Sequence, residues 1–225
     1  MRWLLFIILL SVGWTWEGHT ALVGAVYSSF PPPLQANLSL AFLDEGAIAP
    51  DKIFRDVTRH HYPYSLVQAE RWLGEASASL AEGNYSAASY SFGVAAHYIS
   101  DSFAAPHNMI GESSKDHTSF ERQALRRPLQ SPCQSGPFNL SEALQDATHT
   151  SEDWPLWLDT RNPDIPHQEF EDSLALLYRV AHATFNTTCR KEDVRYHSLP
   201  FWVSAKVLFY FLLLLVFFLI AVRFV

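Results

Sequence analysis

The sequence predicts an all-α fold, with a single multi-helix domain followed by a C-terminal transmembrane helix. Three observations support this prediction. Apolar residues recur at spacings of three and four over long stretches, which gives a helix one apolar face. No stretch alternates apolar and polar residues between turn signals, as strands would. Each end of the chain carries a separate apolar run. The 225 residues are enough for one domain with a substantial core.

The N-terminal run, MRWLLFIILLSVG, has one arginine, an apolar stretch and small residues at Ser11 and Gly13. It is short for a membrane span, and the pattern is typical of a secretory signal peptide rather than of a buried helix. We therefore expect residues 1–13 to be removed. The exported domain would then cover residues 14–199 and begin at Trp14, with Trp16 as the alternative start.

Four helical patterns follow along the domain, at residues 65–83, 84–106, 113–125 and 168–185. The prolines at 31–33 end an earlier helical stretch, and Pro106 ends the second pattern. A serine precedes the third pattern as a cap, and the fourth is long and amphipathic. Residues 131–137, SPCQSGP, are predicted to form a loop.

The C-terminal run is apolar without interruption from Val207 to Val222. With the residues before it, the run reaches the roughly 20 residues that a spanning helix needs. Lys206 and Trp202 suit the membrane interface. We predict a transmembrane anchor at residues 200–225, with a cleaved lipid-anchor signal as the alternative. Either would hold the domain on the extracytoplasmic face of a membrane.

Further features fit an exported domain. Cys133 and Cys189 can form one disulfide in an oxidising compartment. Four glycosylation sequons fit a glycoprotein surface; they begin at Asn37, Asn84, Asn139 and Asn186.

The formal net charge of −7, with no basic run, argues against binding duplex nucleic acid through its phosphates. It leaves open a metal site that handles a phosphodiester, because metal ions would supply the positive charge. No feature of the sequence indicates an oligomeric state.

Potential metal ligands gather in the stretch HYISDSFAAPH. His97 and Asp101 lie one turn apart on the same face of the predicted helix, where two side chains can bind one ion. His107 follows in the turn after Pro106. Downstream, in HTSFE, His117 and Glu121 repeat the spacing of four.

Further candidates lie upstream, at His19, at Asp51 and at the doublet of His60 and His61. Imidazole and carboxylate ligands without thiolate suit zinc and other divalent metals. A single helical histidine is more often an ordinary residue than a ligand, but six of the ten histidines fall between His19 and His117. The remaining four are interpreted as surface or core residues: His149, His167, His182 and His197.

The order of these motifs resembles the zinc-dependent phospholipase C family, which shares an all-α fold with single-strand-specific zinc nucleases. The family pattern has an N-terminal tryptophan freed by signal cleavage, then His, Asp and His, then H-x3-D-x5-H and H-x3-E or H-x3-D. This chain reads Trp14, His19, Asp51, His61, HYISDSFAAPH and HTSFE. The resemblance covers essentially the whole exported domain.

The resemblance implies up to three zinc ions. One would bind Asp51, His61, His97 and the bridging Asp101. A second would bind His107, His117 and Glu121. A third would bind the amino nitrogen and carbonyl of Trp14, with His19 and Asp101. His60 competes with His61 for one position, and His61 is preferred because an aromatic residue follows it, as in the family pattern.

The resemblance also implies a function: hydrolysis of phosphoesters by water that the metals activate, most consistent with a membrane-anchored, phospholipase C-like enzyme acting on a phospholipid or another phosphodiester. Asp51, a ligand with a free oxygen, is the candidate catalytic residue that orients or deprotonates the water. Two alternatives remain. The spacing of Trp14 and His19 is the nuclease-like version, which favours a single-strand nuclease or nucleotidase. A non-catalytic surface protein stabilised by zinc would also keep the ligands.

Overall fold

The computed structural model describes residues 14–56, 58–110 and 112–190, and in these the secondary structure is helical, with no strand. The elements in chain order are α1 (Trp14–Ser29), α2 (Pro32–Gln35), α3 (Leu40–Ala49), the π-helical turn η1 (Pro50–Phe54), α4 (Tyr64–Ala81), α5 (Tyr85–Asp101), η2 (Ala105–Asn108), α6 (Ser114–Ala124), α7 (Leu140–Asp146), η3 (Ala147–Glu152), α8 (Asp153–Thr160) and α9 (Asp164–Thr184). The predicted all-α class is confirmed.

The predicted helices are present with small shifts at their ends. The second pattern ends at Asp101, before Pro106, which lies instead in the short η2 turn. Ser113 caps α6 by accepting a hydrogen bond from the Asp116 backbone N–H. Among the described residues, α3, α7 and α8 lie outside the patterns recognised by periodicity. The reason for α3 is that it is apolar on most sides, and α7 and α8 are short.

Two of the predictions concern the ends of the chain. The predicted signal peptide at 1–13 and the predicted anchor at 200–225 lie outside the described residues. Within the described ranges, none of the helices combines the length and the apolar character needed to cross a membrane.

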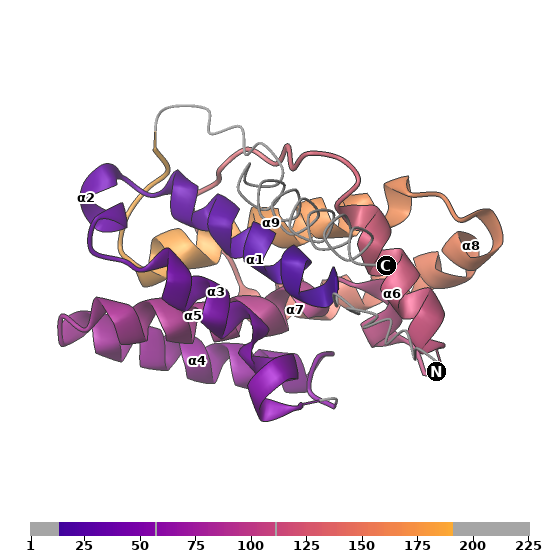
Figure 1. The fold of residues 1–225 in the computed structure, drawn as a ribbon, viewed down its shortest axis with the longest axis horizontal. Helices are drawn as coiled ribbons and strands as arrows, with labels where there is room; N and C mark the ends of the chain where they lie inside the picture. Colours follow the sequence, from indigo (N-terminus) through magenta and orange to yellow (C-terminus); the bar gives the residue numbers. More distant parts are fainter. Residues whose placement is uncertain (1–13, 57, 111, 191–225) are drawn as a thin grey trace, which may run out of the picture.

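Helix α5 lies at the centre of the domain and is buried along nearly all its length. It packs against α4 on one side, against α3 on another, and against α1 and α9 (Figure 1). Helix α6 packs on α9 and α1, and α8 lies at one end of the molecule. This central position explains the small residues of α5, because several helices must approach the same helix closely.

Two glycines allow α3 and α5 to touch through their backbones. A Cβ on Gly93 would lie 2.3 Å from the Leu43 carbonyl oxygen, and one on Gly46 would lie 2.1 Å from the Tyr90 carbonyl oxygen. Because neither backbone atom can move away without shifting a helix, only glycine fits at these two positions. The close approach places the carbonyl of Ala47 beside α5, where it becomes part of the metal centre described below.

We predict that Gly93→Ala destabilises the domain by about 1–3 kcal/mol, the usual range for overpacking a core. The same variant should bind metal more weakly, because α3 must move away from α5. Gly74→Ala is the matched control, since a Cβ on Gly74, in the interior of α4, meets nothing within 4 Å. That control should stabilise the helix by up to about 1 kcal/mol. Urea unfolding of both variants measures the difference, and equal stability would contradict the backbone contact.

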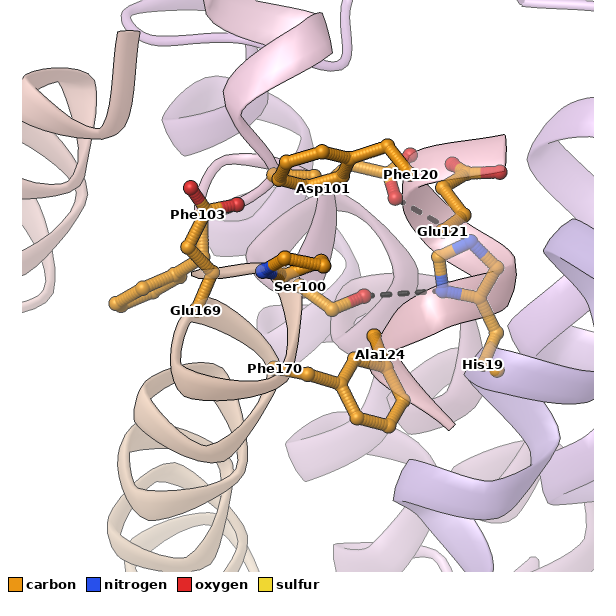
Figure 2. Close-up of a pocket in the computed structure, with 12 residues that line it drawn as sticks. His19, Ser100, Asp101, Phe103, Phe120, Glu121, Ala124, Glu169 and Phe170 are labelled. Carbon is orange, nitrogen blue, oxygen red and sulfur yellow. Dashed lines mark hydrogen bonds and ion pairs between the residues drawn. The ribbon is translucent and has the colours of Figure 1, made fainter. Parts of the chain in front are cut away.

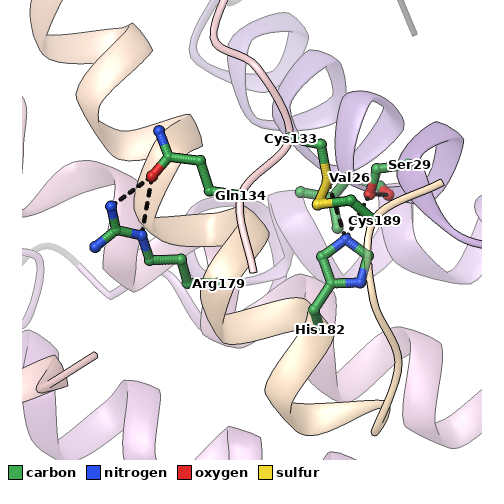
Figure 3. The surroundings of a disulfide bond; sticks show 7 residues. All are labelled: Val26, Ser29, Cys133, Gln134, Arg179, His182 and Cys189. Carbon is green, nitrogen blue, oxygen red and sulfur yellow. Dashed lines mark hydrogen bonds between the residues drawn. A yellow bond between two sulfur atoms is a disulfide. The ribbon is translucent and has the colours of Figure 1, made fainter. Parts of the chain in front are cut away.

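The predicted disulfide between Cys133 and Cys189 is present (Figure 3). It joins the loop after α6 to the segment after α9, across 56 residues of sequence. The Nε2 atom of His182 lies 3.1 Å from the Cys133 sulfur and 3.2 Å from the Ser29 hydroxyl. Since both sulfurs are bonded to each other, this group is a covalent link and not a metal site.

Candidate metal centre

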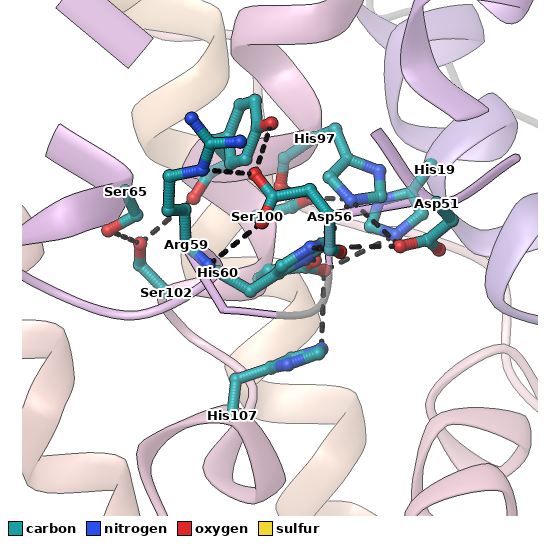
Figure 4. Close-up of polar contacts among 12 residues, drawn as sticks. His19, Asp51, Asp56, Arg59, His60, Ser65, His97, Ser100, Ser102 and His107 are labelled. Carbon is teal, nitrogen blue, oxygen red and sulfur yellow. Dashed lines mark hydrogen bonds and ion pairs between the residues drawn. The ribbon is translucent and has the colours of Figure 1, made fainter. Parts of the chain in front are cut away.

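The buried carboxylate of Asp101 lies among four histidines. These are His19, His60, His97 and His107, which come together in Figure 4. The carboxylate's Oδ2 atom lies 2.5 Å from His60 Nδ1 and 3.1 Å from His97 Nε2. Its Oδ1 atom lies 3.2 Å from His19 Nε2 and 3.6 Å from His107 Nε2. The predicted helical pair on α5 therefore becomes the meeting point of residues from four separate segments.

Asp51 approaches the same group from the turn η1, which directly continues α3. Its Oδ1 atom lies 3.5 Å from His97 Nε2 and 3.8 Å from His60 Nε2. Short π-helical turns of this kind are frequent at functional sites, because they re-aim one side chain out of the helical register. Asp51, His60 and His97 offer ligand atoms that all lie within 4.8 Å of one another.

The second predicted motif forms a neighbouring group. On α6, His117 Nε2 lies 2.9 Å from Glu121 Oε1, and His107 Nε2 lies 3.7 Å from the same oxygen. The His107 and His117 rings meet edge to face, with their centres 4.6 Å apart. The structure thus brings His107, His117 and Glu121 together, as the resemblance implied.

The structure corrects the choice within the histidine doublet. His60, and not His61, lies in the cluster: it is 5% exposed and reaches both Asp101 and His97. His61 is only partly buried, and its ring packs against Tyr64 with the centres 5.5 Å apart. The aromatic residue after the doublet, Tyr62, was therefore a poor guide, because it does not determine which of the two rings turns toward Asp101.

His19 lies on α1 in contact with the cluster, with its ring 4.0 Å from that of His97. Trp14 is the first residue of α1. Its predicted ligand atoms, the free amine and the carbonyl, depend on a cleavage whose preceding residues lie outside the described part of the chain. The contribution of Trp14, or of Trp16, to a metal site therefore remains a prediction.

Hydrogen bonds fix the orientation of the histidine rings. His97 donates from Nδ1 to the Ala47 carbonyl at 2.7 Å. His60 donates from Nε2 to the Asp56 carbonyl. In each ring the opposite nitrogen then faces the carboxylate of Asp101, where it can hold either a proton or a metal ion.

The ring of His19 has the same arrangement. The Ser100 hydroxyl donates to the His97 carbonyl at 2.9 Å, so its oxygen accepts from His19 Nδ1 at 3.0 Å. This leaves the lone pair of His19 Nε2 facing Asp101. Lone pairs that face a carboxylate repel it unless a cation lies between them. The cluster therefore has the electronic structure of a cation site.

The pKa values of the clustered residues also indicate that the carboxylates stabilise positive charge at this site. Burial lowers the pKa of His97, but the Asp101 and Asp51 carboxylates raise it further, to about 10. Burial opposes ionisation of Asp101, yet the surrounding histidines, His107 first, hold its pKa well below the usual value. His19 is kept neutral, because burial and the neighbouring His97 lower its pKa to about 4. His97 therefore holds a proton that a bound metal ion would replace, because metal binding requires neutral imidazole beside ionised carboxylate.

One further atom points to a missing partner. His107 Nε2 is buried and has no hydrogen bond, although it faces oxygens of Asp101 and Glu121 at longer distances. Buried polar atoms are seldom left unsatisfied, so such an atom calls for a ligand. Imidazole and carboxylate donors, without thiolate, fit zinc in four-coordinate sites.

A pocket lies beside the cluster, between α1, α5, α6 and α9 (Figure 2). Phe103, Phe120 and Phe170 form apolar parts of its wall, and Glu169 lies on the opposite side from His19. The Glu169 carboxylate is buried; its Oε2 accepts from the Ala105 backbone N–H at 2.9 Å, and its Oε1 has no partner. Burial raises the pKa of Glu169 well above its ordinary value. Glu169 thereby holds the turn that presents His107.

We predict that Glu169→Gln stabilises the domain at neutral pH. As pH rises above the ordinary glutamate value, the unfolded chain loses a proton that Glu169 keeps in the folded state, so the wild-type chain loses stability. Glutamine still accepts from Ala105 and has no proton to lose. The difference in Tm should be small near pH 4 and grow with pH in thermal unfolding; a constant difference would contradict the prediction.

Glu171→Gln, two residues along α9, is the control with the opposite sign. The two oxygens of Glu171 accept from the backbone N–H groups of Gln130 and Ser131, both at 2.5 Å. An amide would face one of these donors with its own NH2 group. This variant should therefore lower Tm throughout the pH range, since it leaves a buried donor without an acceptor.

Several residues of the centre lie outside the motifs found by sequence reasoning. They are the groups that orient the histidines: the Ala47 and Asp56 carbonyls, the Ser100 hydroxyl, Glu112, whose carboxylate lies 3.5 Å from His117 Nδ1, and Glu169. Backbone carbonyls carry no residue signature. Ser100 could have been found from the sequence, because it acts through its side chain and directly precedes Asp101 on the helix.

Comparison with known proteins gives one match. The family described as zinc dependent phospholipase C matches the chain over residues 18–171, which includes every described residue of the cluster. No curated protein and no solved structure matches the chain.

Proposed function

The chain belongs to the zinc-dependent phospholipase C family, and from this we propose that its metal centre hydrolyses the phosphodiester bond of phospholipids. Zinc is the cofactor that the family and the donor set both support. The observation that carries the proposal is the arrangement around Asp101, where four imidazole rings from separate segments converge on one buried carboxylate.

The chain offers ligands for up to three zinc ions. Following the family resemblance, a first set would be Asp51, His60, His97 and Asp101, a second His107, His117 and Glu121, and a third His19 and Asp101 with the main chain of the mature N-terminus. In support, ligand atoms lie within 4.8 Å of one another in the groups Asp51–His60–His97, His19–His97–Asp101 and His107–His117–Glu121. When bound, zinc acidifies a coordinated water towards neutral pH and neutralises charge on the phosphate. Asp101 belongs to two sets and so ties their positions together.

The exposure of the ligands indicates how substrate reaches the centre. His97 is fully buried, whereas the side chain of Asp51 is 27% exposed and that of His117 is 18% exposed. Solvent and a phosphate group would therefore approach on the side of these two residues. One oxygen of Asp51 faces His97, so the other is free to accept a proton from, and orient, the attacking water.

The same proposal includes export and membrane anchoring. The Cys133–Cys189 disulfide suits an oxidising compartment. The asparagines of all four sequons are exposed, as glycosylation requires. Together with the apolar runs at 1–13 and 200–225, these features support a glycosylated domain on the extracytoplasmic side, held by a C-terminal helix.

The test is turnover by the purified full chain with its zinc content measured. We expect at least one equivalent of zinc and release of the phosphorylated head group from phosphatidylcholine. Cleavage of single-stranded DNA or a nucleotide instead would identify the alternative on the same scaffold. A chain that binds zinc fully and hydrolyses none of these would be a zinc-stabilised surface protein, which would overturn the proposal.

A further inference from the structure

An exposed apolar turn lies directly beside the open side of the metal centre. Ile53 and Phe54 follow the ligand Asp51 in η1, and their side chains are 53% and 40% exposed. The Phe54 ring stacks on the ring of Trp72, with centres 5.7 Å apart and planes within 8°. The turn is therefore held in place by packing on α4 while it presents apolar surface to the outside.

Further exposed apolar and aromatic side chains lie on α1 and at the start of α4, the helix on which Phe54 packs. Lys52 lies over the ring of Trp16, 5.1 Å from its centre, and Trp16 is 38% exposed. Tyr64 and Val67, three residues apart at the start of α4, are 55% and 59% exposed. We call Trp16, Lys52–Arg55, Tyr64 and Val67 the rim. Apolar surface gathered around a site in this way marks an interaction surface.

The charges of this segment differ from those of the whole chain, whose net charge is −7. Lys52, Arg55 and Arg59 are exposed. Of the two acidic residues in this segment, Asp51 belongs to the cluster, and Asp56 is 5% exposed and accepts from Tyr98 and Arg59. Because Arg59 is paired with Asp56, Lys52 and Arg55 supply the positive charge next to Ile53 and Phe54.

Positive charge, exposed aliphatic residues and Trp or Tyr side chains are the combination that binds the head-group region of a bilayer. The chain outside the described residues supplies a second argument. Its apolar run from Val207 to Val222 would bring the domain to a membrane.

We propose that the rim inserts into the surface of a phospholipid bilayer, so that Ile53 and Phe54 lie among the lipids and the metal centre opens onto their head groups. The inference rests on the proposed function, because it gives the phospholipid substrate its route to Asp51. It adds a binding surface that the ligands themselves do not provide.

The test places a nitroxide spin label at Ile53→Cys in the full chain, reconstituted in vesicles of phosphatidylcholine with some phosphatidylserine. Leu156→Cys is the matched control, because Leu156 is also 53% exposed and lies on α8, outside the rim. We expect the label at position 53 to be reached by oxygen and shielded from a water-soluble nickel complex. Equal access of the nickel complex to both positions would overturn the proposal.

A second measurement separates this inference from the proposed function. Ile53→Asp should lower turnover of vesicle phospholipid roughly tenfold, the effect of one lost buried aliphatic side chain, and leave turnover of a soluble short-chain phospholipid unchanged. Leu156→Asp should change neither. Equal losses on both substrates would count against membrane insertion. Failure of the wild-type chain on both substrates would refute the proposed function, whereas the spin-label result would still decide the inference.

Discussion

Asp101→Asn should bind zinc at least about 100-fold more weakly than the wild-type chain and lose its phosphoester hydrolysis. The loss should exceed the 10–100-fold cost of removing an outer partner of a ligand, because Asp101 is itself shared by several groups. An amide supplies one acceptor oxygen and no negative charge, whereas four imidazole nitrogens converge on the two oxygens of this carboxylate. Its NH2 group would also face nitrogen lone pairs across a site built for a cation.

Zinc content after dialysis, together with turnover of phosphatidylcholine, measures this effect. Asp116→Asn is the control: Asp116 lies on α6 and pairs with Arg161 at the surface, so removing its charge should leave zinc and turnover unchanged. Circular dichroism checks that both variants remain helical. Full zinc content and normal turnover in Asp101→Asn would remove this residue from the centre.

The second large effect is expected within the histidine doublet. His60→Ala should lose at least one zinc and reduce turnover by more than about 100-fold, since it deletes a ring that contacts Asp101 and lies near Asp51. His61→Ala should keep the zinc and stay within a few-fold of wild-type activity, because its ring packs on Tyr64 outside the cluster. The two variants remove the same imidazole ring from two adjacent positions, so they differ only in which ring is lost.

Zinc content and turnover of the two variants therefore form a direct test of the geometry. The informative comparison is the ratio between them, since any general effect of removing a histidine from this turn is common to both. A larger loss in His61→Ala than in His60→Ala would contradict the role of His60 and would favour His61 as the metal ligand.

The parts of the centre that the sequence predicted are those in which helical geometry fixes the distance. His97 with Asp101, and His117 with Glu121, lie one turn apart on α5 and α6, so their spacing alone places each pair on one face. His60 lies in a turn, where no repeat fixes direction. Its orientation depends on the backbone carbonyl of Asp56. Because every residue type has such a carbonyl, the sequence gives no sign of this contact.

Tertiary contacts explain the rest of the difference. Glu169 reaches the turn before His107 from a helix much later in the chain, and no local pattern connects the two. Periodicity did not reveal α3, because this helix is apolar on most sides: one side packs between α1 and α5, and Leu40 and Phe42 are exposed on the other. In both cases the prediction would have required knowing which helices become neighbours, and no local pattern in a single sequence gives this information.

The disulfide determines where mechanical load would enter the domain. Cys189 lies at the end of the described chain, and the residues that follow continue to Val225. Under the proposed anchoring, tension would reach the fold at this sulfur and at the backbone bond from Arg190 to Ser29. The disulfide would pass this force directly into the loop at Cys133, so that helix α9, which lies between the two cysteines in sequence, would be bypassed.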